Sequence, residues 1–256
     1  MYISTTNSTN TLMKELLAKG EWREGERFLY TAFQTAGRGQ AGNGWESEEG
    51  KNLLCSILLP PKKELFDLNV LTAVAVHKVI RSLLFERSGL LSLSEAVSIK
   101  WSNDIYYGDK KVAGILIENA IIGNEIKYSI AGIGLNVNQT TFLSSAPNPV
   151  SLKQISGKET DIDALMQALM TQIEALEATD EAQVWAYYRE HLYRREGFWP
   201  FVEREVSTAP TMNAEKGAEG IFLAKIENVR TNGEIELRDQ AGNLRIYHFK
   251  QVRYVL

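Results

Sequence analysis

The chain has 256 residues, and its 28 Lys and Arg against 32 Asp and Glu give a net charge of −4. Its 44% hydrophobic and 23% charged residues are typical of a globular protein and exclude a disordered or fibrous one. No basic run favours nucleic-acid binding, and no signal-like N-terminus or apolar run of about 20 residues is seen, which predicts a cytoplasmic protein without membrane attachment.

The first predicted element is a short helix. Residues 7–10, Asn-Ser-Thr-Asn, offer side-chain oxygens that can cap a helix start, and an apolar stretch follows at residues 12–17. Gly20 then supplies a typical C-terminal signal. The polar cluster is therefore expected at the entrance of a helix.

A glycine-rich loop follows at residues 34–45, with glycines at 37, 39, 42 and 44. Such spacing lets the backbone approach a ligand closely, and Arg38 adds a planar, permanently charged group suited to phosphate or carboxylate. The first three glycines match the dinucleotide-binding pattern, but no helix is predicted directly afterwards, and residues 44–52 do not have P-loop spacing. The plain alternative is a solvated surface loop.

Residues 53–59 form an apolar run that predicts a buried strand and contains Cys55, the single cysteine. A buried thiol is inert unless a cationic niche activates it, so Cys55 is read as structural. One cysteine also excludes disulfides and a cysteine-based metal site. Apolar residues at helical spacing between Asp67 and Arg87 then predict a helix with one face on a core.

Three strands are predicted next, at residues 99–107, 111–120 and 127–138, with turn signals at 108–109 and 123–124. They indicate an antiparallel meander rather than alternating strands and helices. In the first strand, Lys100 to Asp104 place polar groups in an apolar setting, where a ligand or metal would have to supply their partner. Lys111 begins the second strand, and Gly114 lies where a side chain would block close approach; a solvated turn lysine is the alternative.

Two helices at residues 161–176 and 181–192 are expected to close a large domain, residues 1–196. Short alternating strands follow at 198–206, 221–229, 234–238 and 245–255, separated by turns at 217–220, 232–233 and 242–243. Residues 197–256 therefore predict a small β-barrel domain.

Taken in order, these motifs resemble the biotin protein ligases. The resemblance rests on Ser8-Thr9-Asn10, Gly37-Arg38-Gly39 through Gly42 to Trp45, Lys100-Trp101 with Asn103-Asp104, Lys111 with Gly114, and Gly132-Ile133-Gly134-Leu135-Asn136. It implies an α+β fold: a class II aminoacyl-tRNA synthetase-like mixed sheet with flanking helices, and an SH3-like C-terminal β-barrel. Because the first motif starts near residue 1, a short form without the N-terminal DNA-binding domain is expected.

The resemblance implies an enzyme that activates biotin with ATP and Mg²⁺ to biotinyl-5'-AMP. It then transfers biotin to a specific lysine of a biotin carboxyl carrier protein or domain. No tightly bound prosthetic group, nucleic acid or membrane is implied, and the enzyme is expected to be a monomer or homodimer. No covalent enzyme intermediate is needed, in keeping with the lack of a cysteine or histidine motif suited to one.

The resemblance also implies site residues. The catalytic residues are Lys111, Arg38 and Asp104, with Asp104 also the magnesium ligand and the acceptor of the lysine proton. The biotin-binding residues are Ser8, Thr9, Asn10, Gln34, Arg38, Gly39, Gln40, Lys111 and Gly114. The ATP-binding residues are Arg38, Trp45, Lys100, Asn103, Asp104, Lys111 and Asn136. Helix capping is the alternative for Ser8 and Thr9, and core packing is the alternative for Trp45.

Two positions depart from the family pattern, because Gln40 and Asn43 stand where basic residues are common. With fewer cations in the loop, we expect weaker retention of the charged adenylate. Two other functions stay open. A lipoate or octanoate ligase or transferase would share the fold, and a nonenzymatic biotin- or nucleotide-binding module would have lost its chemistry.

Overall fold

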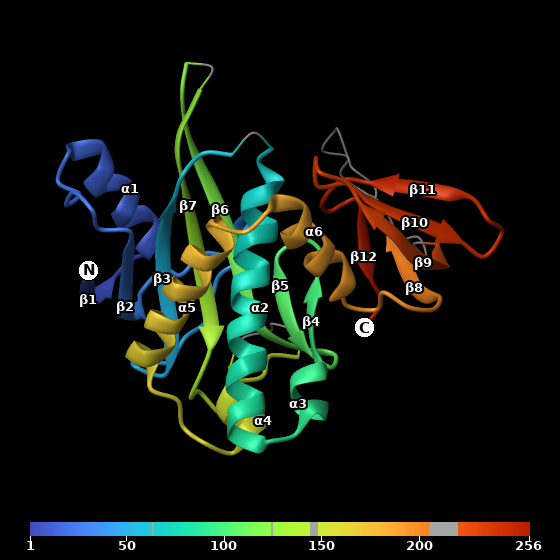
Figure 1. The fold of residues 1–256 in the computed structure, drawn as a ribbon, viewed down its shortest axis with the longest axis horizontal. Helices are drawn as coiled ribbons and strands as arrows, with labels where there is room; N and C mark the ends of the chain where they lie inside the picture. The colour runs from blue at the N-terminus through green and yellow to red at the C-terminus, as the bar shows by residue number, and fades with distance from the viewer. Residues whose placement is uncertain (63, 124, 144–147, 205–219) are drawn as a thin grey trace, which may run out of the picture.

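The computed structural model describes residues 1–62, 64–123, 125–143, 148–204 and 220–256 of the chain. Within these ranges, helices pack against a seven-stranded mixed sheet, and a five-stranded antiparallel sheet lies beside it (Figure 1). This arrangement confirms the predicted α+β class with a separate C-terminal β unit.

The first sheet has the strand order β1-β2-β3-β7-β6-β5-β4. β1 and β2 pair in parallel, and the other neighbours pair antiparallel. The predicted meander is confirmed as β4 to β7, whereas β1 was not predicted. The strands are β1 (Tyr2–Thr6), β2 (Phe28–Gln34), β3 (Asn52–Leu59), β4 (Val97–Lys100), β5 (Asp104–Tyr107), β6 (Lys110–Ile122) and β7 (Glu125–Asn136).

The predicted helices are present, and two short ones join them. α2 lies across the first sheet and contacts α5 and α6 (Figure 1). The predicted loop at residues 34–45 contains only a single 3₁₀ turn, η1 (Gln40–Gly42), so no dinucleotide-binding helix follows the glycines. The helices are α1 (Thr9–Lys19), α2 (Phe66–Ser88), α3 (Leu91–Glu95), α4 (Leu152–Ser156), α5 (Ile162–Glu177) and α6 (Glu181–Glu190).

Helix α2 is the central element of the core. By length and composition it could cross a membrane, so the expectation that no segment reaches this threshold was wrong. However, 67% of its apolar window is buried inside the protein, against the sheet and the neighbouring helices. A helix that is apolar on most sides is typical of the core of a globular protein, and this burial accounts for the apolar run.

The predicted strand at residues 99–107 is wrong in one respect. The chain folds back at residues 101–103, so that Ile99 of β4 pairs with Ile105 of β5. The polar Ser102 and Asn103 therefore lie in a tight turn and not in the middle of a strand. Polar side chains that bond to nearby groups favour such turns.

The second sheet has the order β11-β10-β9-β8-β12. The predicted strand at residues 245–255 is two strands, because the chain turns at residues 248–251, where Lys250 has a φ of 74°. Residues 205–206 of another predicted strand and residues 217–219 of a predicted turn lie outside the described residues. The strands are β8 (Trp199–Glu203), β9 (Ile221–Val229), β10 (Ile235–Asp239), β11 (Leu244–Tyr247) and β12 (Val252–Tyr254).

Side-chain contacts connect the second sheet to the turn between β4 and β5 and to helix α6. The Trp101 indole nitrogen donates to the Gly233 carbonyl oxygen at 3.0 Å. Arg189 of α6 donates from Nε and Nη2 to the Val229 carbonyl oxygen at 3.2 and 3.1 Å. The second sheet therefore lies beside the turn at residues 101–103, which carries the predicted site residue Asn103 and is flanked by two others, Lys100 and Asp104.

Candidate functional site

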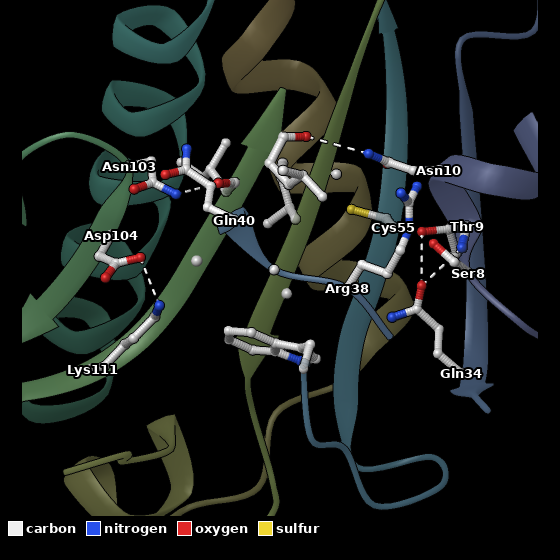
Figure 2. Close-up of a pocket in the computed structure, with 18 residues that line it drawn as sticks. Ser8, Thr9, Asn10, Gln34, Arg38, Gln40, Cys55, Asn103, Asp104 and Lys111 are labelled. Atoms are coloured by element: carbon white, nitrogen blue, oxygen red, sulfur yellow. Dashed lines mark hydrogen bonds and ion pairs between the residues drawn. The ribbon is translucent and has the colours of Figure 1, made fainter. Parts of the chain in front are cut away.

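One cavity lies between the start of α1, the glycine-rich loop and strands β6 and β7 (Figure 2). All nine residues predicted to bind biotin line it. The lining residues are Ser8, Thr9, Asn10, Gln34, Arg38, Gly39, Gln40, Trp45, Cys55, Asn103, Asp104, Lys111, Gly114, Ile115, Leu116, Gly132, Ile133 and Gly134. Residues more than 100 positions apart in the chain thus meet at one place.

Asn10 is the centre of a hydrogen-bond network at one end of this cavity. Its Oδ1 accepts from the buried Ser56 hydroxyl at 2.6 Å, and its Nδ2 donates to Glu118 Oε2 at 2.8 Å and to the Leu116 carbonyl at 3.3 Å. A Cβ at Gly132 would lie 2.5 Å from Asn10 Oδ1. The glycine therefore leaves the space that this side chain occupies.

Ser8, Thr9 and Gln34 form the uncharged part of the wall. Ser8 occupies the N-cap position of α1 but makes no side-chain cap hydrogen bond, so the capping alternative is wrong for its side chain. The Thr9 amide and hydroxyl both donate to Gln34 Oε1, at 2.8 and 3.2 Å. These bonds orient the Gln34 carboxamide beside the cavity, as Figure 2 shows.

Arg38 extends from the glycine-rich loop, which folds back on itself. The Gly39 amide donates to the Asn43 carbonyl at 2.7 Å, and the Trp45 amide donates to the Gly37 carbonyl at 2.9 Å. The Arg38 guanidinium lies 2.8 Å from Glu118 Oε2 of β6.

Glu118 was not predicted as a site residue. It accepts hydrogen bonds from both Arg38 and Asn10 through the same oxygen. The one signal in the sequence is its place at the end of the segment that begins with Lys110 and Lys111. Its partner could not be read from the sequence, because Arg38 and Glu118 are 80 residues apart.

Lys111 and Asp104 form the second charged pair of the cavity, with 2.7 Å between Nζ and Oδ1 (Figure 2). The sheet register places Asp104 opposite Gly114. A Cβ at Gly114 would lie 3.2 Å from Lys111 Nζ and 3.0 Å from Trp45 Cζ3. The predicted role of this glycine, to permit close approach, is confirmed in its geometry.

The Trp45 ring packs against the glycines of the sheet. A Cβ at Gly134 would lie 2.7 Å from the ring atoms Cδ2 and Cζ2, and Lys111 Nζ is 5.7 Å from the ring centroid. Trp45 is half-buried, and its Nε1 is buried without a partner among the described residues. It therefore forms a wall of the site and is not enclosed in the core.

A wider cleft opens next to this cavity and reaches the second sheet. It contains every predicted ATP-binding residue except Arg38, which lines only the inner cavity. The predicted ATP-binding residues that line this cleft are Trp45, Lys100, Asn103, Asp104, Lys111 and Asn136. Three cationic residues of the C-terminal segment, Arg204, Lys250 and Arg253, also line the cleft and were missed, because nothing in their local sequence marks them.

Three of the predicted polar residues already have protein partners. Lys100 Nζ donates to the Tyr106 hydroxyl at 3.1 Å and lies 5.2 Å from the centroid of the Tyr254 ring, and burial lowers its pKa. Asn103 Nδ2 donates to the Ile115 carbonyl, and Asn136 Nδ2 donates to the Val150 carbonyl at 3.3 Å. The expectation that a ligand or metal must supply the partners of Lys100 and Asn103 was therefore wrong.

Arg38 and Lys111 line the same cavity, as predicted, but from different sides (Figure 2). Each cation is paired with its own carboxylate, Glu118 for Arg38 and Asp104 for Lys111. Two positive groups thus face one space. Their nearest charged partners are carboxylates that a bound anion would compete with or replace.

The resemblance implied magnesium at Asp104. The described residues hold no group of three or more His, Cys, Asp or Glu side chains that could bind a metal ion. Asp104 is moreover paired with Lys111. Because Mg²⁺ at nucleotide sites is commonly held by one or two carboxylates and by phosphate oxygens, Asp104 fits an ion that arrives with ATP but not one held by the protein alone.

Cys55 lies in the cavity wall, on β3. Burial raises the pKa of its thiol to about 12, so it remains protonated at neutral pH. The prediction of a buried strand thiol is confirmed, and the residue has no activated thiolate to offer as a nucleophile.

Comparisons with known proteins agree with this geometry. The model of the Biotin/lipoate A/B protein ligase family matches residues 2–136. The bifunctional ligase/repressor BirA of Bacillus spizizenii is 30% identical over 222 residues, which are 84% of this chain and 62% of the relative. A biotin–[acetyl-CoA-carboxylase] ligase of Paracoccus denitrificans is 28% identical over 172 residues, 65% of this chain and 68% of the relative.

Two solved structures show the same fold. The biotin protein ligase of Aquifex aeolicus, in complex with biotin and ATP, superposes with a TM-score of 0.73 at 22% identity, over 100% of this chain and 98% of that one. The Leishmania major enzyme, in complex with biotinyl-5-AMP, gives 0.64 at 20% identity, over 96% and 97%. The chain spans only 62% of the length of the BirA relative from Bacillus spizizenii. The likeness to the solved structures confirms the predicted fold class.

Proposed function

Since the chain belongs to the Biotin/lipoate A/B protein ligase family, we propose that it is a biotin protein ligase. It would activate biotin with ATP to biotinyl-5'-AMP. It would then transfer biotin to a lysine of a biotin carboxyl carrier protein or domain, the kind of acceptor that the name of the Paracoccus denitrificans relative suggests.

The observation that carries this proposal is that one cavity combines uncharged hydrogen-bonding side chains with two cations. Ser8, Thr9 and Gln34 line it, and Arg38 and Lys111 face the same space from different sides. A neutral ureido ring needs hydrogen-bonding groups without charge, and a carboxylate needs cations. Biotin combines both requirements in one molecule.

The first half-reaction joins two anions. The biotin carboxylate attacks the α-phosphorus of ATP, and pyrophosphate leaves. Arg38 and Lys111 would hold the carboxylate and the α-phosphate together and stabilise the charge that develops on the phosphate oxygens. For this, each cation has to share or exchange the carboxylate it contacts, Glu118 or Asp104.

In the second half-reaction, the acceptor lysine attacks the carbonyl carbon of the mixed anhydride, an amide bond forms and AMP leaves. Lys111 would stabilise the carbonyl oxygen as it gains charge. The attacking amine has to lose a proton, and Asp104 is the nearest carboxylate to Lys111 that could take it. Magnesium bound with ATP would neutralise phosphate charge, with Asp104 as the residue that could contact it.

The remaining features of the proposal concern the whole protein. We assign residues 1–196 to a catalytic domain and residues 197–256 to a C-terminal domain, and we expect a cytoplasmic enzyme. Arg204, Lys250 and Arg253 line the outer cleft and add positive charge where the triphosphate would enter.

The test is ATP–pyrophosphate exchange with biotin, lipoate and octanoate in parallel. We expect exchange with biotin and at least about tenfold less with the two fatty acids, because neither carries a ureido ring for the uncharged polar side chains to bind. Exchange with lipoate or octanoate alone would assign the chain to the other branch of the family. Exchange with none of the three would favour a nonenzymatic binding module.

A second assay follows transfer to a purified biotin carboxyl carrier domain by mass spectrometry. The matched control is the same domain with its acceptor lysine replaced by arginine. Modification of the first and not the second is expected, whereas equal modification of both would contradict specific transfer.

A further inference from the structure

Arg194 lies in the segment between α6 and β8, where the chain passes from the first sheet to the second. Its side chain is only 8% exposed, although arginine is rarely buried. Its φ of 54° lies in the left-handed region, which is uncommon for a residue other than glycine. Such a conformation persists only where the surroundings hold it in place.

On one side, Arg194 contacts the second sheet. Its Nη1 donates to the Val255 carbonyl oxygen at 2.7 Å, just beyond β12. The guanidinium carbon lies 4.6 Å from the centroid of the Trp199 ring, which is in β8. These contacts join the side chain to two adjacent strands of the second sheet.

On the other side, Arg194 contacts the turn between β5 and β6. Its Nη2 lies 3.7 Å from Asp109 Oδ1, and the same carboxylate oxygen accepts a hydrogen bond from the Tyr193 hydroxyl. Asp109 lies between the two members of the charged pair in the cavity, Asp104 at the start of β5 and Lys111 near the start of β6. The hairpin of β5 and β6 therefore carries both residues, one on each strand.

The packing around this contact extends to the site. The Tyr193 ring packs at a tilted angle against the rings of Tyr106 in β5 and Tyr254 in β12. The distances between ring centroids are 5.2 and 5.6 Å. Lys100 Nζ lies 4.7 Å from the Tyr106 ring centroid and 5.2 Å from that of Tyr254. Strand β5, which begins with Asp104, is thus connected to the second sheet through Tyr193 and Lys100.

We infer that Arg194 is a positioning residue through which the C-terminal sheet holds the β5–β6 turn and thereby sets Lys111 relative to Asp104. The part of this inference that concerns catalysis rests on the proposed function, because it assumes that Lys111 acts in adenylate formation. The structural part, that Arg194 holds the β5–β6 turn against the C-terminal sheet, does not depend on the proposed function. The C-terminal sheet, on this view, is a support for the active site as well as one side of its cleft.

The chain offers a matched control in Arg189. Its guanidinium also donates to a carbonyl of the second sheet, that of Val229, and also lies 4.6 Å from an indole ring, that of Trp185. Among the described residues, Arg189 makes no hydrogen bond, ion pair or ring contact with the β5–β6 turn. Arg194→Ala and Arg189→Ala therefore each remove an arginine that contacts the second sheet, but only the first is expected to loosen the turn.

The first measurement is hydrogen–deuterium exchange of the whole chain. Arg194→Ala should raise the exchange rate of amides in residues 104–113 by about tenfold. This is a local opening, which can occur without a change in the global stability of the protein. Arg189→Ala should leave the exchange rate of that segment unchanged. Equal protection of the segment in both variants would overturn the inference, whatever the enzyme activity. Arg194→Lys keeps the charge but not the planar fork, so it should restore protection only in part.

The second measurement is ATP–pyrophosphate exchange with biotin. Arg194→Ala should lower kcat by about tenfold or more, because a misplacement near 1 Å can cost up to about 100-fold, while KM for biotin changes less than about twofold. Asp109→Asn should lower kcat similarly, and the double variant should add little to either. A fall in kcat that Arg189→Ala shares would reject the positioning role. An inactive wild type would reject the proposed function, and the hydrogen-exchange result would still decide the inference.

Discussion

Lys111 Nζ lies 2.7 Å from Asp104 Oδ1 across two adjacent antiparallel strands. The contact is possible because the residue opposite Asp104 is Gly114, where a side chain would crowd the ammonium group. The pair lies at the junction of the inner cavity and the outer cleft, which both include it. In the proposed reaction the biotin carboxylate attacks the α-phosphate of ATP at this junction. The positive charge of Lys111 would neutralise both groups there.

Replacement of Lys111 by alanine should lower biotin-dependent pyrophosphate exchange by roughly 100- to 1000-fold, the usual effect of removing one group that stabilises transition-state charge. The free energy of unfolding should change by no more than about 1 kcal/mol, because partly exposed ion pairs contribute little. Lys110→Ala, which removes the exposed neighbour, is the control and should be near wild type. Wild-type exchange in Lys111→Ala would remove this lysine from the mechanism.

Replacement of Gly134 by alanine should destabilise the protein by about 1–3 kcal/mol, because the added methyl group overlaps the rigid Trp45 ring. Urea unfolding measures the effect. In a Trp45→Ala background the same change should cost much less, since the obstructing ring is absent. Gly44→Ala is the control in the loop, where the nearest atom would be 3.8 Å away. Additive effects of the Gly134 and Trp45 changes would show that the two residues do not meet.

The buried His77 should make stability depend on pH. Burial lowers its pKa from 6.5 to about 3, and the ring contacts the Tyr187 hydroxyl and the Val97 carbonyl, with His191, Lys78 and Arg81 close by. Because the unfolded state binds the proton more readily, the stabilisation is fully present above pH 6.5 and is lost as the pH falls from there toward 3. The same direction holds for His191, whose pKa burial also lowers.

The check is the slope of unfolding free energy against pH between pH 6.5 and 4.5. His77→Gln should reduce that slope by about 1.4 kcal/mol per pH unit at most, the contribution of one proton. His248→Gln is the control, because that ring is 68% exposed. An unchanged slope in His77→Gln would mean that this histidine does not stay neutral in the folded protein.

Gln40 should affect how well the adenylate is retained. It lines the inner cavity, and its Oε1 is buried without a hydrogen-bond partner among the described residues. Gln40→Arg would add a cation where family members commonly carry one. A charge-assisted hydrogen bond from it to the adenylate would contribute about 1.5–3 kcal/mol. This corresponds to roughly tenfold or more tighter retention of the adenylate.

Biotinylation of a bystander protein measures this leakage. We expect it to fall in Gln40→Arg and in Asn43→Arg, and to stay at or above the wild-type level in Gln40→Leu, which removes the amide without adding charge. Equal bystander labelling in the wild type and in both arginine variants would contradict the idea that missing cations weaken retention.

The sequence alone predicted the elements that depend on local pattern. The apolar spacing of α2, α5 and α6 predicted three helices, and strand β9 was predicted with its observed bounds. The glycine-rich loop was recognised because glycines have backbone freedom that other residues do not. The inner cavity contains all nine residues that the resemblance assigned to biotin, because these motifs belong to elements that the fold brings together.

Only the tertiary structure decided which groups pair. Arg38 bonds to Glu118, 80 positions away in the sequence, because β6 lies close to the glycine-rich loop. Lys100 bonds to Tyr106 because the chain turns at residues 101–103. The second sheet brings Arg204, Lys250 and Arg253 to the cleft, and the segment between α6 and β8 brings Arg194 to the β5–β6 turn. Periodicity is a property of about ten consecutive residues, whereas these contacts depend on strand order and on how two sheets pack, which no local window contains.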